Sequence, residues 1–145
     1  GRPVEALPVL QRALAASPDD PRFLKDLGDL YAGSLENMQE ALAAYTRLAA
    51  AAGDGATRIE ANLAMGALLE KNGAGEEAAA CYDRAAQAGS VPPAIHRRRG
   101  ELWEAAGDVA RARAAYDAYL ECEEDPGLRR TIEERRQALP SEGTP

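Results

Sequence analysis

The sequence predicts an all-α, right-handed solenoid of about eight antiparallel helices, and two observations support this prediction. Alanine makes up about a fifth of the 145 residues and charged residues 28%, while long β-branched runs are absent, a composition that favours helices over strands. Self-similarity at a period near 34 residues is typical of helical hairpins stacked side by side. Pairs of identical residues that lie 34 positions apart include Gly66 and Gly100, Gly73 and Gly107, Ala78 and Ala112, and Tyr82 and Tyr116.

The first complete helical pair is predicted at about residues 20–53. Asp19-Asp20-Pro21 begins a helix, because an acidic N-cap is followed by a proline whose missing N–H has no intrahelical partner to lose there. Gly28 lies among the leucines of the apolar face, which indicates that a neighbouring helix packs closely at that point. A turn at Gly33 and Ser34 leads to the second helix, and Gly53-Asp54-Gly55 ends that helix.

Two further pairs repeat this plan at about residues 58–90 and 93–125, with internal turns at Asn72-Gly73 and Gly107-Asp108. A half repeat at 3–18 precedes the first pair, and a helix at 126–139 caps the array, so that the solenoid spans residues 1–139. Residues 140–145 have no periodicity and are expected to be a disordered tail. The first pair carries one extra residue in its internal turn and is followed by three extra residues in the connection 52–58. We expect these insertions to remain in turns, which a solenoid tolerates.

The repeated positions resemble the tetratricopeptide repeat, whose pattern is a large residue, Leu-Gly, Tyr, and later Ala, an aromatic residue and Pro. The resemblance covers roughly residues 3–126. Asn62, His96 and Arg99 depart from it at positions that are usually apolar, so we expect the third unit to pack loosely or its first helix to be rotated. The matching residues are Leu24, Leu27-Gly28, Tyr31, Ala41 and Tyr45 in the first unit, Met65-Gly66, Leu69, Ala78 and Tyr82 in the second, and Gly100, Trp103, Ala112, Tyr116 and Pro126 in the third.

The resemblance implies a module that binds another protein, because in this family the first helix of each pair lines a concave groove. The guanidinium groups of Arg97 and Arg98 would bind an acidic segment there. Arg97 and Glu101 are also spaced to form an ion pair along one helix, and both interpretations remain open. A specialised subset of the family binds a C-terminal carboxylate, but Asp29 would repel that group. The groove positions in this sequence are Lys25, Asp29, Glu60, Ala67, Arg97, Arg98, Glu101 and Glu104.

An apolar stripe of Val4, Leu7, Leu10 and Leu14 marks the half repeat. Its helix takes the second place of a pair and lacks the first, so the stripe is expected to be exposed. We therefore expect either a piece of a longer protein with more repeats upstream, or a homodimer formed through this stripe. The corresponding alternative function is a structural or self-assembly segment of a larger multi-repeat protein.

No catalytic site, cofactor or metal centre is predicted. His96 is the sole histidine and no nucleophile motif accompanies it. Gly73-Ala74-Gly75 lacks the lysine of a phosphate-binding loop. Cys81 and Cys122 do not have a metal-ligand spacing, and we expect both to be half-buried thiols.

Charge and hydropathy exclude two classes of partner. The net charge of −7 argues against a nucleic-acid surface, and the longest apolar stretch, 48–52, is too short to cross a membrane. The excess of alanine and arginine, with lysine only at positions 25 and 71, suggests a GC-rich bacterial genome. The sequence therefore predicts a cytoplasmic, non-enzymatic adaptor or scaffold whose partner is a protein or peptide.

Overall fold

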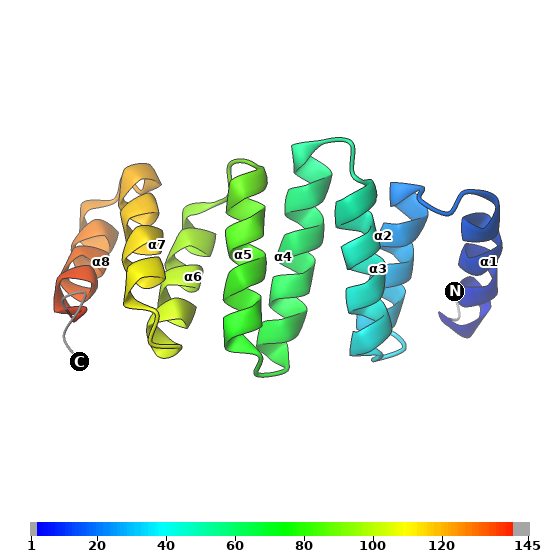
Figure 1. Ribbon diagram of the computed structural model, residues 1–145, viewed down its shortest axis with the longest axis horizontal. Coiled ribbons are helices and arrows are strands. Elements are labelled where there is room, and N and C mark those ends of the chain that lie inside the picture. Colours follow the sequence, from blue (N-terminus) through cyan, green and yellow to red (C-terminus); the bar gives the residue numbers. More distant parts are fainter. Residues whose placement is uncertain (1–2, 141–145) are drawn as a thin grey trace.

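The computed structural model describes the backbone of residues 3–140 and the side chains of residues 5–140. Within this range the chain forms eight helices and no strand, and the helices stand side by side in one row from the N-terminus to the C-terminus (Figure 1). The predicted all-α solenoid is confirmed, and residues 141–145 of the predicted tail lie outside the described range. The helices are α1 (Pro3–Ala16), α2 (Pro21–Ala32), α3 (Met38–Ala51), α4 (Gly55–Lys71), α5 (Gly75–Ala88), α6 (Pro93–Ala105), α7 (Val109–Cys122) and α8 (Pro126–Ala138).

Side-chain caps fix the N-termini of five helices. The Asp20 carboxylate accepts a hydrogen bond from the Arg22 N–H at 3.0 Å, and Pro21 follows it as the first residue of α2. Asp125 and Pro126 begin α8 in the same way. Each cap satisfies an N–H group that has no partner inside the helix.

A glycine–tyrosine contact repeats in every pair and explains the periodicity of the sequence. The rings of Tyr45, Tyr82 and Tyr116 pack on the backbone of α2, α4 and α6, where the glycines stand. A Cβ atom at any of these glycines would lie less than 3.0 Å from ring carbons, so only glycine lets the second helix of the pair approach this closely. The contacting pairs are Gly28 with Tyr45, Gly66 with Tyr82, and Gly100 with Tyr116.

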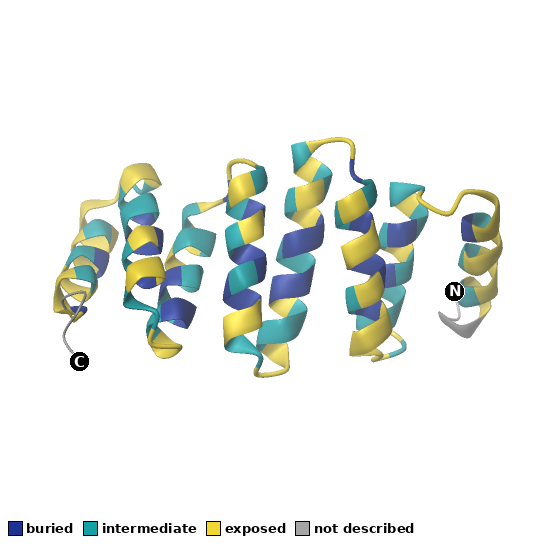
Figure 2. Ribbon diagram, viewed as in Figure 1, coloured by how far each residue is buried: buried dark blue, intermediate teal, exposed yellow. Residues whose placement is uncertain are grey.

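The large side chains of the third unit are buried, with Trp103 and Tyr116 at most 1% exposed, contrary to the expectation of loose packing. The Arg99 side chain is only 13% exposed and forms an ion pair with Asp83 at 3.4 Å. The indole N–H of Trp103, itself buried, donates to the same carboxylate at 2.9 Å. Asp83 therefore compensates the charge of Arg99, which stands at a position that is usually apolar. Burial is concentrated where the helices face one another along the whole row (Figure 2).

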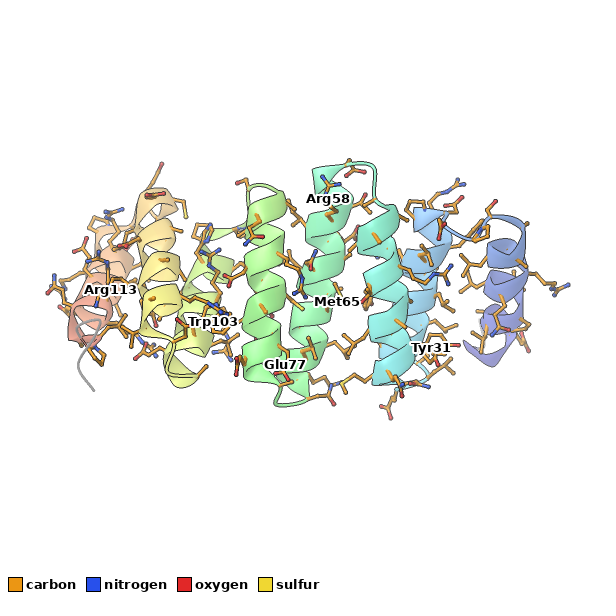
Figure 3. All side chains as sticks on the ribbon, in the orientation of Figure 1. Tyr31, Arg58, Met65, Glu77, Trp103 and Arg113 are labelled. Atoms are coloured by element: carbon orange, nitrogen blue, oxygen red, sulfur yellow. The ribbon has the colours of Figure 1, made fainter. Side chains whose placement is uncertain are left out.

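Helix α4 is longer than its counterparts, which corrects the prediction that the extra residues before it lie in a turn. It has 17 residues, against 12 in α2 and 13 in α6, and it extends beyond the ends of its neighbours (Figure 1). Asp54 caps this added turn by accepting from the Thr57 N–H at 2.7 Å. The turn ends at Arg58, which Figure 3 places at the N-terminal end of α4.

Candidate functional site

The first helices of the three pairs, α2, α4 and α6, form one face of the array together with α8. Helix α2 packs directly against α4, while ion pairs join α4 to α6 and α6 to α8. We call this surface the inner face. It carries Lys25, Asp29, Glu60, Ala67, Glu70, Arg97, Arg98, Glu101, Glu104 and Arg135.

In the second unit, the tyrosine that packs on the glycine also holds a carboxylate of the inner face. The Tyr82 hydroxyl donates to Glu70 at 3.1 Å. Glu70 in turn forms an ion pair with Arg98 of the following unit at 2.7 Å. Arg98 also pairs with Glu101 on its own helix at 3.0 Å. One carboxylate thus connects a tyrosine of its own unit to an arginine of the next.

The third unit repeats this arrangement with α8 as its neighbour. The Tyr116 hydroxyl donates to Glu104 at 2.6 Å, and Arg135 of α8 pairs with Glu104 at 2.7 Å. Arg135 also approaches Glu101 at 3.5 Å. The capping helix is therefore held to the array by charge as well as by the buried Ile132.

The first unit uses a different carboxylate. The Tyr45 hydroxyl donates to Asp29 at 2.7 Å, and Lys25 pairs with Asp29 on the same helix at 2.7 Å. Lys25 reaches α4 only through Glu60, at 3.4 Å. Ala32 lies at the position that Glu70 and Glu104 occupy in the later units.

These contacts shift the pKa values of the groups involved. The hydrogen bond from Arg98, opposed in part by burial, lowers the pKa of Glu70. Burial raises the pKa of Glu104, but hydrogen bonds from Tyr116 and Arg135 outweigh it and the net pKa is lowered. Burial and the Glu70 charge raise the pKa of Tyr82 to about 12. Donors from neighbouring helices thus favour the charged form of Glu70 and Glu104.

The predicted groove residues fall into two groups on the inner face. Lys25, Asp29 and Glu60 form one group. Arg97, Arg98, Glu101 and Glu104 form the other, around α6. Ala67 is exposed on α4. The sequence interpretation missed Glu70 and Arg135, although a glutamate four residues after both Gly66 and Gly100 was visible as a repeated signal.

The family follows from the sequence once this geometry is known. A model of the tetratricopeptide repeat matches residues 1–56 and 63–128, which is most of the chain. The chain belongs to the tetratricopeptide repeat family. Members of this family generally act as non-catalytic modules that mediate protein–protein interaction. A comparison with curated protein sequences found no match to this chain.

Solved structures agree with this tetratricopeptide fold. A crystal structure of MamA superposes with a TM-score of 0.60 and 17% identity, over 88% of this chain and 81% of MamA. A second MamA structure gives a TM-score of 0.60 and 17% identity over 92% of this chain and 75% of that one. PilF of Pseudomonas aeruginosa gives a TM-score of 0.59 and 16% identity, over 88% of this chain but only 56% of PilF. At this level of identity the likeness concerns the fold alone.

The three consecutive arginines of the third tetratricopeptide unit lie in three different environments. Arg97 is 48% exposed, and its one ion pair, with Glu101, is long at 3.9 Å. Arg98 joins two units through Glu70, and Arg99, whose side chain is mostly covered, pairs with Asp83. Of the predicted pair at 97 and 98, Arg97 is therefore the guanidinium with the weaker internal pairing.

The N-terminal stripe of the half repeat is less exposed than predicted. Leu14 is buried at 8% exposure and belongs to the core that includes Leu24, while Leu7 and Leu10 are half-buried. The expectation of an exposed stripe is wrong for Leu14, because α1 packs against α2. The side chain of Val4 lies outside the described residues.

The histidine and the two cysteines of residues 5–140 lie apart from the inner face, in separate environments. Burial and the nearby Arg99 charge lower the pKa of His96. Cys81 is buried, and burial raises the pKa of its thiol; Cys122 is exposed, contrary to the predicted half-burial. Among the described residues, histidine, cysteine and acidic side chains do not gather in groups of three that could hold a metal ion. None of the helices within residues 3–140 combines the length and apolarity needed to span a bilayer.

Proposed function

We propose that this chain is a cytoplasmic, non-enzymatic adaptor or scaffold that binds a partner protein or peptide through the inner face. The observation that supports this function is the fixed arrangement of charge on that face. Tyrosine hydroxyls and cross-unit ion pairs hold Asp29, Glu70 and Glu104 in place. Binding to such a surface requires little further ordering of side chains, which favours affinity.

The partner segment carries an acidic residue where it passes α6. Arg97 is half-exposed and only weakly paired, so its guanidinium is available for a carboxylate of the partner. Arg98 is engaged by both Glu70 and Glu101 and acts mainly between units. This division assigns recognition to Arg97 and positioning to Arg98.

Replacing Arg97 by glutamate tests this assignment. In affinity capture from the source organism, quantified by mass spectrometry, R97E is expected to lose the partner that the unaltered chain retains. Arg47→Glu is the matched control, because Arg47 is 49% exposed and lies on α3, away from the inner face. Both variants should keep the helicity and melting temperature of the unaltered chain. Equal capture by R97E and R47E would remove the inner face from the proposed function.

Self-association through α1 is a second candidate function. Val9 has the most exposed large apolar side chain among the described residues, at 57%. It borders a cavity of about 540 Å³ between α1 and α2, which is also lined by Ala6 and Leu10. Sedimentation equilibrium is expected to show a dimer that V9E converts to a monomer. A monomer at every concentration of the unaltered chain would exclude this candidate.

A further inference from the structure

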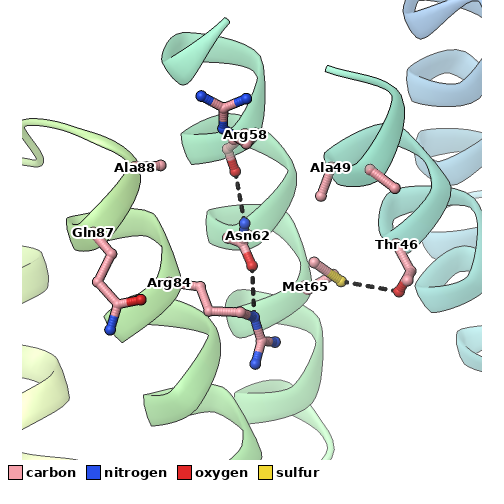
Figure 4. A pocket seen from close by; sticks show the side chains of 9 residues that line it. Thr46, Ala49, Arg58, Asn62, Met65, Arg84, Gln87 and Ala88 are labelled. Carbon is pink, nitrogen blue, oxygen red and sulfur yellow. Dashed lines mark hydrogen bonds between the residues drawn. The ribbon is translucent and has the colours of Figure 1, made fainter. Parts of the chain in front are cut away.

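A second groove lies on the opposite side of α4 from the inner face. It is a cavity of about 550 Å³ between α3 and α5, with α4 as its floor (Figure 4). At 100° per residue, Asn62 and Met65 lie on the side of α4 that faces away from Glu60 and Ala67. We call this cavity the outer groove. Its lining residues are Thr46, Ala49 and Ala50 from α3, Arg58, Asn62 and Met65 from α4, and Arg84, Gln87 and Ala88 from α5.

Among the described residues, no carboxylate lies within ion-pair distance of the two guanidinium groups in the outer groove, although the charge of Arg58 acts on Asp54. Arg58 donates to the carbonyl oxygen of Ala52 at 3.1 Å. Arg84 donates to Asn62 Oδ1 at 3.0 Å and to the Cys81 sulfur at 2.9 Å. Within the part of the chain that the structure describes, neither guanidinium forms an ion pair, whereas most of the other arginines do. Two unpaired cations in one groove are notable in a chain whose net charge is −7.

Asn62 holds one of these cations in a fixed direction. It is buried, its side-chain N–H donates to the Arg58 carbonyl oxygen at 2.8 Å, and its Oδ1 accepts from Arg84. Figure 4 shows this chain of hydrogen bonds crossing the floor of the groove. The guanidinium of Arg84 is therefore positioned before any ligand arrives.

The next groove along the array provides an internal comparison. It lies between α5 and α7, has a volume of about 440 Å³, contains Asp83, Arg99 and Arg111, and shares Arg84 and Gln87 with the outer groove. Asp83 neutralises Arg99 at 3.4 Å, and Asp108 pairs with Arg111 at 3.1 Å. The residue after the packing tyrosine is thus an aspartate there, whereas in the outer groove the same position is Thr46.

Thr46 leaves the outer groove without an acidic group of its own. Its hydroxyl contacts the Met65 sulfur at 3.5 Å, in place of the Asp83–Arg99 pair of the next unit and the Asp117–Arg136 pair of the last. Asp54, at the end of α4, is engaged in capping Thr57. Thr46 and Met65 thus replace both members of the ion pair found in the next unit, and Arg58 and Arg84 line a groove to which no carboxylate contributes.

We propose that the outer groove binds an acidic segment of a partner protein, with a glutamate or aspartate side chain between Arg58 and Arg84. Guanidinium N–H groups are suited to bind carboxylate oxygens. Gln87 adds a polar donor, while Ala49, Ala88 and Met65 contact the apolar atoms of the segment. The volume is in the range of pockets that enclose small ligands or a few side chains. The acidic character of the whole chain disfavours a polyanion such as nucleic acid.

The proposal can be tested with two model peptides and NMR on the isotopically labelled chain. The probe is acetyl-Ala-Glu-Leu-Glu-Ala-amide at millimolar concentration, and its isosteric control carries glutamine at both glutamate positions. The glutamate peptide is expected to shift the side-chain signals of Arg84 and Asn62, and the glutamine peptide is not. Shifts confined to Arg97 and Arg98 would overturn this proposal while supporting the inner-face function.

Variants of the groove sharpen the test. Thr46→Asp introduces the aspartate that the next groove already has. It is expected to lower the affinity for the glutamate peptide about tenfold, because the new carboxylate repels the peptide and competes with it for the arginines. Thr131→Asp, at an exposed position of α8, is the control with the same change of charge. A second comparison sets Arg58→Gln against Arg47→Gln, which also makes the same change of charge. Equal affinities in each variant and its control, or no shift with the glutamate peptide, would overturn the proposal.

Discussion

The first helical pair and the two that follow share one packing contact but differ in how they are tied to their neighbours. Glycine meets tyrosine in the same way in all three pairs. The carboxylate that receives the tyrosine hydroxyl is Asp29 in the first pair, where Lys25 pairs with it on the same helix. In the later pairs the tyrosine hydroxyl donates to a glutamate, and an arginine of α6 or α8 forms an ion pair with that glutamate.

This difference separates two tasks that the repeat performs. Close packing fixes the shape of each pair and depends on the absence of a side chain at one position. Ion pairing between units adds to stability and fixes charge on the inner face, but it varies without altering the shape. The ion pair across the boundary between the first and second units joins Lys25 to Glu60 at 3.4 Å. Glu60 is more exposed than Glu70 and Glu104, so this ion pair is expected to stabilise its boundary less.

The largest expected effect comes from the contact that all pairs share. Gly66→Ala places a methyl group against the Tyr82 ring and should lower the free energy of unfolding by about 1–3 kcal/mol. Urea denaturation followed by circular dichroism measures this loss. Gly53→Ala is the control, because nothing lies within 4 Å of a Cβ there. Equal stability of both variants would mean that the tyrosine ring moves aside freely and that the contact does not define the pair.

A smaller effect should distinguish the unit boundaries. Arg98→Gln removes the links to Glu70 and Glu101 and should lower the free energy of unfolding by about 1 kcal/mol, whereas Lys25→Gln should lower it by about 0.3 kcal/mol. The same urea titration measures both. If Lys25→Gln has the larger effect, the first boundary is the more strongly charge-stabilised one and the comparison is reversed.

Acid should weaken the later boundaries by a modest amount. The pKa of Glu70 is below its ordinary value of 4.5 in the folded chain, so the unfolded chain binds protons first as the pH falls. The stabilisation is present above about pH 4.5 and is lost as the pH falls through the lower, folded pKa. The melting temperature should therefore decline through this range, and Glu70→Gln should reduce the decline. An unchanged decline in E70Q would show that other carboxylates cause it.

Much of the fold could be predicted because its determinants are local and periodic. The helix starts at Pro21 and Pro126 and the turn at Gly73, whose φ is +79°, depend on a few adjacent residues. Gly28, within an apolar helix face, indicates a closely packed neighbour, which is Tyr45. Each of these signals acts within one helix or one turn, where spacing along the chain determines spacing in space.

The remaining features depend on how one unit is offset against the next. Glu70 and Arg98 are 28 residues apart, and no spacing rule within a helix relates them. Arg99 violated the apolar pattern because its partner, Asp83, comes from the preceding unit. The added turn of α4 is hard to predict because Gly53 and Gly55 flank Asp54 in a pattern typical of a loop, whereas Asp54 and Thr57 form a helix cap.

The added turn of α4 has a consequence for how such arrays diversify. Gly55–Arg58 precede the stretch of α4 that matches α2 and α6, so the added turn lies at the helix end and the Gly66–Tyr82 contact is the same as in the other pairs. A repeat protein can therefore acquire a new recognition side chain at the rim of a helix at little energetic cost to its neighbours. Growth at helix ends offers evolution and engineering a route to novel specificity that leaves the stacking register intact.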